Sequence, residues 1–269
     1  MIKMFSRHAR ALALTAGFVG MLGLAACGKQ EDKPAAAPQV AAQPRVYRVG
    51  VESAYAPFSS ENEQKTVVGF DIDVMKALAK KIGIEVKFVP TPFESIFNSL
   101  AQGDLDLLIS AITITEERKK SVSFSDPYFV ATQAIAVPAN DTKVTKMDDL
   151  KTLTVGTQSG TSGDDLVQQV LGKNSAKIKR FESTPLALKE LEGGGVDAVV
   201  ADEPVVKNYI ANNPNSKLRT VNDSAFPKED YGVAVRKDDP ELLAKVNKGL
   251  AEMKADGSFA AINAQYFGK

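Results

Sequence analysis

A short, largely apolar run at residues 105–109 constrains the fold most, because it has the length of a buried strand and polar residues follow it at once. Strands buried on both faces are typical of α/β sheets, which bind ligands beyond the carboxyl ends of their strands. Ser110, Thr113 and Arg118 follow the run. Hydroxyls, backbone N–H groups and a guanidinium can together bind a carboxylate. The stretch therefore predicts a carboxylate site; the alternative is a buried strand, a polar loop and a surface arginine.

The same order of features recurs once in the chain. AQGDLDLLISA at residues 101–111 and EGGGVDAVVAD at residues 192–202 each run from a helix end through glycine and aspartate into an apolar strand and a polar cluster. Helix-glycine-strand connections are common, so the repeat alone is weak. It suggests two α/β units, each with polar groups at a strand end.

The first half of the chain predicts alternating strands and helices. Asp71 is the expected N-cap of a helix that ends at Gly83, after a hairpin-like segment that ends at Val68. The expected strands are residues 46–51, 84–89 and 105–109, and the expected helices are residues 71–82 and 93–102. This order predicts a parallel sheet with right-handed crossovers.

A second unit is expected after a break at residues 128–132. Its predicted strands are residues 153–156, 178–181 and 196–201, and its predicted helices are residues 164–171, 186–191 and 203–212. A strand at residues 231–236 and helices at residues 240–255 and 258–267 would complete the chain.

The N-terminal residues are predicted to lie outside the fold. Residues 1–26 have a basic start and then an apolar stretch with three glycines, which is typical of a secretory signal peptide. The sequence Leu-Ala-Ala-Cys that ends at Cys27 resembles a bacterial lipoprotein cleavage site, which implies cleavage before Cys27 and a lipid on its thiol. The alternative is an ordinary signal peptide with a chance cysteine. Residues 27–45 are rich in alanine, proline and charge and are predicted to form a disordered tether.

Composition excludes several functional classes. His8 and Cys27 are the only histidine and cysteine in the chain, so the processed chain would lack histidine and a free thiol. Catalytic triads and His/Cys metal sites are therefore not expected, and neither is any cofactor or metal. Basic and acidic residues number 33 each, and loss of the three basic residues of the leader leaves a net charge of −3. We expect no nucleic-acid partner.

Several motifs, taken in order, carry a resemblance that covers almost the whole processed chain. They are ESAYAPF after the first strand, VGFDIDV, SAITITEERKKSVSFSDPY, SGTSG, VDAVVADEP and MKADGSFAAINAQYF. The chain resembles the polar amino-acid-binding proteins of bacterial ABC importers (solute-binding protein family 3). The resemblance implies an α/β two-lobed periplasmic-binding-protein fold of type II. Each lobe would be a mainly parallel sheet flanked by helices, and two strands would form the hinge.

The resemblance also implies domain limits. Lobe 1 would comprise residues 46–131 plus 228–269, and lobe 2 residues 132–227. The chain would cross between the lobes near Val130 and Pro227.

Within the cleft, the resemblance implies that Arg118 binds the α-carboxylate of the ligand, assisted by the N–H groups of Thr113 and Ser162. Asp202 would bind the α-ammonium, together with the Ser110 carbonyl and the Thr113 hydroxyl. Many relatives carry glycine where this chain has Ser162, which is a departure from the pattern.

The other end of the ligand would meet a second group of residues. Tyr55 and Phe93 would lie on either side of the ligand side chain, while Glu52 and Gln158 would face its tip. Relatives vary at Gln158, so this position bears on side-chain specificity. The full set of expected ligand-binding residues is Glu52, Tyr55, Phe93, Ser110, Ala111, Thr113, Arg118, Gln158, Thr161, Ser162 and Asp202.

Each position also has a purely structural alternative. Arg118 could be a surface charge of a helix, and Asp202 could be the N-cap of the helix that follows it. Thr113 and Thr115 could cap a helix as well. Glu52 could serve only to order its own loop, and the two aromatic residues could belong to an ordinary core.

The leading hypothesis is a lipid-anchored receptor of the cell envelope, in the periplasm or at the cell surface, that closes on one polar L-amino acid. A membrane permease of an ABC importer would be its partner, its membrane contact would be the N-terminal lipid alone, and it is expected to be a monomer. An acid at residue 52 between two aromatic faces favours arginine or another basic amino acid, then glutamine, with cystine and histidine behind.

Two hypotheses come from other classes. Some proteins of this fold are periplasmic dehydratases of the cyclohexadienyl type, in which Glu52 or Asp202 would act as a general acid. The retained clamp for ammonium and carboxylate favours the receptor over such an enzyme. A sensor domain of a kinase or channel is disfavoured, because no membrane span or signalling domain follows Lys269.

Overall fold

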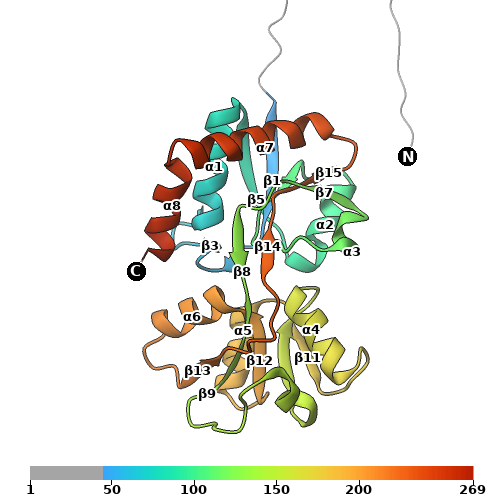
Figure 1. Ribbon diagram of the computed structural model, residues 1–269, viewed down its shortest axis with the longest axis vertical. Helices are drawn as coiled ribbons and strands as arrows, with labels where there is room; N and C mark the ends of the chain where they lie inside the picture. The colour runs from blue at the N-terminus through green and yellow to red at the C-terminus, as the bar shows by residue number, and fades with distance from the viewer. Residues whose placement is uncertain (1–44, 269) are drawn as a thin grey trace, which may run out of the picture. The chain divides into compact units, whose positions relative to one another are not determined.

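The computed structural model describes residues 45–268, which form two sheets joined by a pair of strands (Figure 1). The predicted signal peptide, the lipidation of Cys27 and all of the predicted tether except Arg45 lie outside these residues. Arg45 itself donates a hydrogen bond from Nη2 to Asp106 Oδ1 at 2.8 Å. Among the described residues no helix has both the length and the apolar character needed to cross a bilayer.

The first sheet has the strand order β5-β1-β6-β15-β7. Its strands are β1 (Val46–Val51), β5 (Glu85–Pro90), β6 (Leu107–Leu108), β7 (Val122–Phe124) and β15 (Ala234–Arg236). The β1 strand pairs in parallel with β5 and β6, as the alternating elements predicted, while β15 pairs antiparallel with β6 and β7. The carboxyl ends of β1 and β6 therefore lie side by side, which brings the segments that follow them together.

Helices flank this sheet, and a small hairpin sheet lies beside it (Figure 1). The helices are α1 (Phe70–Ile82), α2 (Phe93–Ala101), α3 (Glu116–Lys119), α7 (Pro240–Ala255) and α8 (Ser258–Phe267), and the hairpin strands are β2 (Ala54–Tyr55), β3 (Ser59–Glu61) and β4 (Val67–Val68). Both terminal helices have the predicted bounds.

The predicted N-cap of α1 is wrong. Gly69 occupies that position with φ of 133°, and a Cβ there would lie 2.3 Å from the carbonyl oxygen of Phe58. Only glycine tolerates both the dihedral angle and the close approach. Asp71 lies inside the helix and is fully buried, so its carboxylate serves another purpose.

The second sheet has the strand order β11-β10-β12-β9-β13. Its strands are β9 (Gln133–Pro138), β10 (Val155–Gln158), β11 (Ile178–Phe181), β12 (Ala198–Asp202) and β13 (Leu218–Val221), and its helical elements are η1 (Met147–Thr152), α4 (Ser162–Leu171), α5 (Thr184–Glu192) and α6 (Glu203–Asn212). The parallel strands β10, β11 and β12 were each predicted to within two residues at both ends. Sequence analysis missed β9 and β13, which pair antiparallel at one side of this sheet.

Two short strands connect the sheets. β8 (Phe129–Ala131) pairs antiparallel with β14 (Glu229–Tyr231), with Val130 opposite Asp230. Val130, near which the first crossing was predicted, is the middle residue of β8, and β14 begins two residues after Pro227. The single strand predicted at residues 231–236 is in fact β14 and β15, which are separated by Gly232 and Val233.

An aromatic cluster fixes these connecting strands against the first lobe. The ring of Phe58 packs edge-on against Phe129 of β8 and Tyr231 of β14, at centroid distances of 5.1 and 5.4 Å. Phe70 of α1 and Phe267 of α8 both contact Phe129, at 5.5 and 4.9 Å. Each such pair adds about 0.5–1.5 kcal/mol beyond simple area burial. The cluster therefore holds the start of the hinge firmly to α1 and α8.

Candidate ligand site between the lobes

A small cavity of about 10 Å³ lies among residues from both sheets. Its lining comprises ten of the eleven predicted residues, namely Tyr55, Phe93, Ser110, Ala111, Thr113, Arg118, Gln158, Thr161, Ser162 and Asp202. Glu52, the eleventh, lies beside it, with Oε2 3.5 Å from Gln158 Nε2. The structure thus brings together all eleven predicted site residues, from positions at or after the ends of β1, β5, β6, β10 and β12.

The guanidinium of Arg118 points into this region. Nη1 donates to the carbonyl oxygen of Thr113 at 2.9 Å, and Nη2 donates to that of Gly160 at 3.1 Å. The guanidinium carbon lies 5.4 and 5.3 Å from the ring centroids of Phe93 and Phe97, which is cation–π range. Burial lowers the pKa of Arg118, although the group stays a cation at any physiological pH. Arg118 is therefore not a free surface charge.

The short helix α3 presents Arg118 to the site. Thr115 is its N-cap, and Oγ1 accepts a hydrogen bond from the backbone N–H of Arg118 at 3.1 Å. The capping alternative therefore holds for Thr115, which does not line the cavity. Thr113 is not a cap.

Asp202 ends strand β12 and is 4% exposed. It occupies the N-cap position of α6, but its side chain makes no capping hydrogen bond. Its carboxylate instead accepts hydrogen bonds from Gln133 Nε2 and the Tyr231 hydroxyl. Burial, and then the neighbouring carboxylate of Glu229, raises the pKa of Asp202 to about 6.

Gln133 and Glu229, which were not predicted as site residues, also belong to this network. Glu229 Oε2 accepts hydrogen bonds from Thr113 Oγ1 at 2.8 Å, Ser162 Oγ at 2.7 Å and Gln133 Nε2 at 3.2 Å. Both missed residues begin strands next to the predicted crossings. A polar residue at the start of the apolar run QAIAVP, beside an expected hinge, was a usable sign of Gln133.

The opposite end of the cavity contains Glu52 and Gln158. The oxygens of Glu52 accept hydrogen bonds from the N–H groups of Ala54 and Phe93, each at 3.0 Å. Gln158 Oε1 accepts from the N–H and hydroxyl of Thr184 at 3.2 and 3.0 Å. Burial raises the pKa of Glu52. Glu52 therefore orders its own loop, as the structural alternative stated. It also lies beside the cavity.

Asp71 supports the site from behind. Its Oδ2 accepts a hydrogen bond from the N–H of Ala111 at 2.6 Å, and its Oδ1 accepts one from the Tyr128 hydroxyl at 2.9 Å. Ala111 lines the cavity with φ of 47°, in the left-handed region that costs a residue with a Cβ about 1 kcal/mol or more. Burial raises the pKa of Asp71 to about 7. The carboxyl group thus holds a strained segment of the cavity wall in place.

The start of α4 supplies backbone donors. Thr161 is its N-cap, and Oγ1 accepts from the N–H of Asp164 at 3.2 Å. A Cβ at Gly163 would lie 3.0 Å from both Gln133 Oε1 and the carbonyl oxygen of Val200, so this first turn packs tightly on β12 and β9. Free N–H groups at a helix N-terminus favour an anion.

The last lining residues are Tyr55 and Ser110. Ser110 Oγ accepts a hydrogen bond from the N–H of Glu52 at 2.9 Å, which ties the segments after β1 and β6 together. Burial, and then the charge of Asp202, raises the pKa of the Tyr55 hydroxyl well above its usual value. Tyr55 therefore adds a neutral aromatic face to the cavity.

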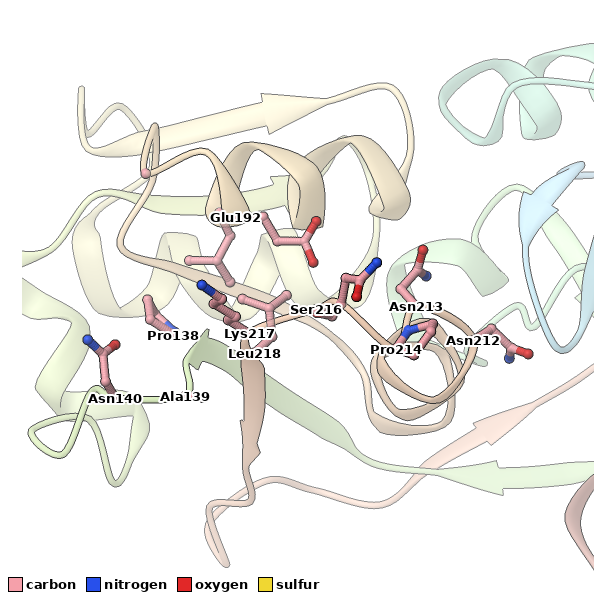
Figure 2. A pocket seen from close by; sticks show the side chains of 13 residues that line it. Pro138, Ala139, Asn140, Glu192, Asn212, Asn213, Pro214, Ser216, Lys217 and Leu218 are labelled. Atoms are coloured by element: carbon pink, nitrogen blue, oxygen red, sulfur yellow. The ribbon is translucent and has the colours of Figure 1, made fainter.

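A larger hollow of about 980 Å³ lies near the end of β9 (Figure 2). Four of its thirteen lining residues are asparagines, and two of these complete the end of α6. Asn212 Nδ2 donates to the Asn208 carbonyl at 2.8 Å, and Asn213 Nδ2 donates to the Tyr209 carbonyl at 2.7 Å. No predicted site residue lies there. Within residues 45–268 no group of three or more acidic, histidine or cysteine residues could hold a metal.

The fold has two α/β lobes and a hinge of two strands, and both lobes contribute residues to a buried charged site. This combination defines a binding protein of the periplasmic type. Comparison with known families agrees. The chain belongs to the bacterial extracellular solute-binding proteins, family 3, whose model matches residues 47–269.

Individual relatives cover most of the chain. A protein described as a probable histidine-binding protein of Neisseria gonorrhoeae is 44% identical over 250 residues, which is 92% of each chain. The structure of an ancestral arginine-binding protein with arginine bound is 44% identical with a TM-score of 0.79, over 82% of this chain and 98% of that one. An ancestral amino-acid-binding protein described as a precursor of cyclohexadienyl dehydratase is 40% identical with a TM-score of 0.75, over 82% and 95%.

Proposed function

We propose that this protein captures one polar L-amino acid between its lobes and delivers it to the membrane permease of an ABC importer. The observation that carries the proposal is the placement of charges. One guanidinium, from Arg118, and the buried carboxylate of Asp202 line the same small cavity. These are complementary to the carboxylate and ammonium that every free amino acid carries.

Arg118 is the proposed partner of the ligand carboxylate. Its two donors now point at the carbonyl oxygens of Thr113 and Gly160. A ligand carboxylate brings the opposite charge and can accept two parallel hydrogen bonds from the guanidinium, so it would displace the carbonyl of Gly160 from Arg118. The backbone N–H groups at the start of α4 would add to the anion site.

Entry of a ligand requires the lobes to separate. The cavity volume of about 10 Å³ is close to the minimum for one water molecule, and an amino acid is several times larger. The two-strand hinge of β8 and β14 allows such a motion. Because the ligand would bind Arg118 on one lobe and Asp202 on the other, its differential affinity would favour the closed form.

The side chain that fits best is basic. Glu52 stands beside the cavity, and Tyr55 and Phe93 line it with two aromatic faces. A flat or extended cation would gain both an ion pair and cation–π contact. We therefore propose arginine or another basic amino acid as the ligand, followed by glutamine. The names of the histidine- and arginine-binding relatives support a basic ligand.

The proposal extends to the organisation of the chain. Lobe 1 would be residues 46–131 plus 228–269 and lobe 2 residues 132–227, with the hinge pair Val130–Asp230 between them. The protein would be exported, anchored by a lipid on Cys27, and monomeric. It would use neither a cofactor nor nucleic acid.

A thermal-melt screen against the common amino acids tests this function. A ligand at 100-fold over its dissociation constant adds about 2.7 kcal/mol to the free energy of unfolding. We expect a clear rise in melting temperature with arginine or another basic amino acid. A screen in which none of the amino acids raises the melting temperature would contradict the proposal.

The raised pKa of Asp202 favours one second candidate. A buried carboxyl group with a pKa of about 6 can act as a general acid near neutral pH, as in a cyclohexadienyl-dehydratase-like enzyme. Turnover of prephenate or arogenate by the purified protein is the test. If the aromatic product forms, the protein is an enzyme and the receptor proposal is wrong. If no product forms at high protein concentration, the enzyme hypothesis is wrong.

A further inference from the structure

Glu229 stands out because one of its oxygens accepts hydrogen bonds from three side chains on separate segments. The side chain is 7% exposed, on the first residue of hinge strand β14. Its Oε2 lies 2.8 Å from Thr113 Oγ1, 2.7 Å from Ser162 Oγ and 3.2 Å from Gln133 Nε2. Buried hydrogen-bond networks of this kind rigidify a structure when their members are satisfied.

These donors belong to different lobes. Thr113 follows β6 of the first sheet. Its segment pairs with β14 through an antiparallel bridge between Thr113 and Tyr231. The N–H of Ile114 also donates a hydrogen bond to the Asp230 carbonyl at 2.8 Å. Glu229 therefore moves with this side of the hinge. Ser162 begins α4 and Gln133 begins β9, both of the second lobe.

The hydrogen bonds to Ser162 and Gln133 accordingly cross between the lobes. When the lobes separate, these two bonds must break, while the bond from Thr113 can persist. A carboxylate oxygen can only accept, so Thr113 and Ser162 each direct their single hydroxyl hydrogen at Glu229. The lone pairs of both hydroxyl oxygens then remain as acceptors, and an acceptor can bind the ligand ammonium but not its carboxylate.

We propose that Glu229 is a positioning residue for ligand capture: it joins Thr113 of one lobe to Ser162 and Gln133 of the other and so stabilises the closed form. This inference rests on the proposed function, because closure is the step that retains the amino acid. Glu229 acts through the lobes and the two hydroxyls rather than through contact with the ligand.

Dissociation kinetics test the proposal once the thermal screen has identified an amino acid. Loss of interlobe bonds that form after encounter should change mainly the dissociation rate. We expect Glu229→Ala to raise the dissociation rate about tenfold with an association rate changed less than about twofold. Glu229→Gln keeps one acceptor oxygen and should lie between Ala and wild type. Asp230→Asn removes a charge from the exposed neighbouring residue and serves as the matched control.

A second measurement does not depend on any ligand. Single-molecule energy transfer between dyes at Lys76→Cys of α1 and Lys207→Cys of α6, in a full-length Cys27→Ser background, reports the distance between the lobes. We expect ligand-free protein to populate a closed form, and Glu229→Ala to reduce that population at least about twofold. Asp230→Asn should leave it unchanged.

The two measurements separate the possible failures. If no amino acid binds the wild type, the proposed function fails while the energy-transfer result still decides the role of Glu229. If the distance distributions of wild type and Glu229→Ala coincide, including the case in which neither shows a closed form, the proposal is overturned. The proposal is also overturned if Glu229→Ala has the melting temperature of the wild type and an unchanged dissociation rate.

Discussion

The two ends of the cavity are built differently. At the charged end, lined by Arg118, Thr113, Ser162 and Asp202 and backed by Glu229, hydrogen bonds run from one lobe to the other. At the side-chain end, formed by Glu52, Tyr55, Phe93 and Gln158, the polar groups are satisfied mainly within their own lobe. Two interlobe exceptions are the contact from Gln158 to Glu52, at 3.5 Å, and the proximity of the Tyr55 hydroxyl to Asp202.

This difference suggests how one fold serves many ligands. Substitution at the charged end would break bonds that both lobes share, and buried polar groups would lose their partners. A substitution at Glu52 or Gln158 would change contacts mainly within one lobe and, apart from the long contact between these two residues, would leave the interlobe hydrogen bonds in place. We therefore expect the charged end to determine whether an amino acid binds, and the side-chain end to determine which one.

The strongest test of the charged end is Arg118→Ala. A ligand carboxylate left without its charge partner in a closed cavity should weaken binding by about a thousandfold or more. Lys119→Ala, on the same helix but exposed, should bind like the wild type. Calorimetric titration of both variants checks this, and unchanged affinity of Arg118→Ala would remove Arg118 from the site.

The support behind the charged end gives the next largest effect. The pKa of Asp71 is raised to about 7, so ionisation of its carboxyl opposes folding. The protonated carboxyl therefore contributes its full stability below about pH 4, and this contribution is lost as the pH rises through 7. Asp71→Asn cannot ionise and can still bond Ala111 and Tyr128. We expect wild type to lose roughly 3 kcal/mol relative to this variant between about pH 4 and pH 7.

Denaturant unfolding across this pH range measures the effect. Asp104→Asn, at an exposed position, should follow the wild-type pH dependence. Parallel curves for wild type and Asp71→Asn would show that the carboxyl of Asp71 does not titrate in this range.

The charged end should also respond to pH through Asp202. Its pKa of about 6 means that protonation competes with binding of the ligand ammonium below that pH. We expect the affinity to be proportional to the fraction of Asp202 that is ionised, and therefore to fall about tenfold from about pH 7 to pH 5. Asp202→Asn should bind weakly at both values without this dependence, and a wild-type affinity independent of pH would argue against contact between Asp202 and the ammonium.

The smallest change in total affinity is expected at the side-chain end. Glu52→Gln removes the charge that favours a basic ligand but keeps an acceptor for its own loop. Arginine affinity should fall several-fold to tenfold and the preference should move toward glutamine. Competition titrations with arginine, lysine, histidine and glutamine measure this. If glutamine binds the wild type best and the substitution changes nothing, the basic-ligand proposal is wrong.

Much of this architecture was predictable from local pattern. Apolar runs ending at Ser110, Gln158 and Asp202 marked the buried strands, and their polar ends marked the cavity, because parallel strands align their carboxyl ends. Glycine and proline marked the helix limits. The terminal helices α7 and α8 were predicted with their observed bounds.

The remainder depends on tertiary contacts that local pattern does not contain. Glu229 lies on a three-residue strand, too short to show a period, and its partners Thr113 and Ser162 are 116 and 67 residues away. Asp71 has the sequence context of an N-cap, yet helix packing buries it against Ala111. β13 (LRTV) was missed although β11 (IKRF), which has the same length, was predicted, so run length alone does not separate the two strands.

Calorimetric titration with the best amino acid and two of its derivatives tests the central claim most directly. The decarboxylated amine lacks the carboxylate that we propose binds Arg118, and the N-acetyl derivative lacks the ammonium that we propose binds Asp202, while both keep the side chain. We predict one-to-one binding of the amino acid and affinity at least about a hundredfold weaker for each derivative. Derivatives that bind as tightly as the free amino acid would contradict recognition by a charged end shared between the lobes.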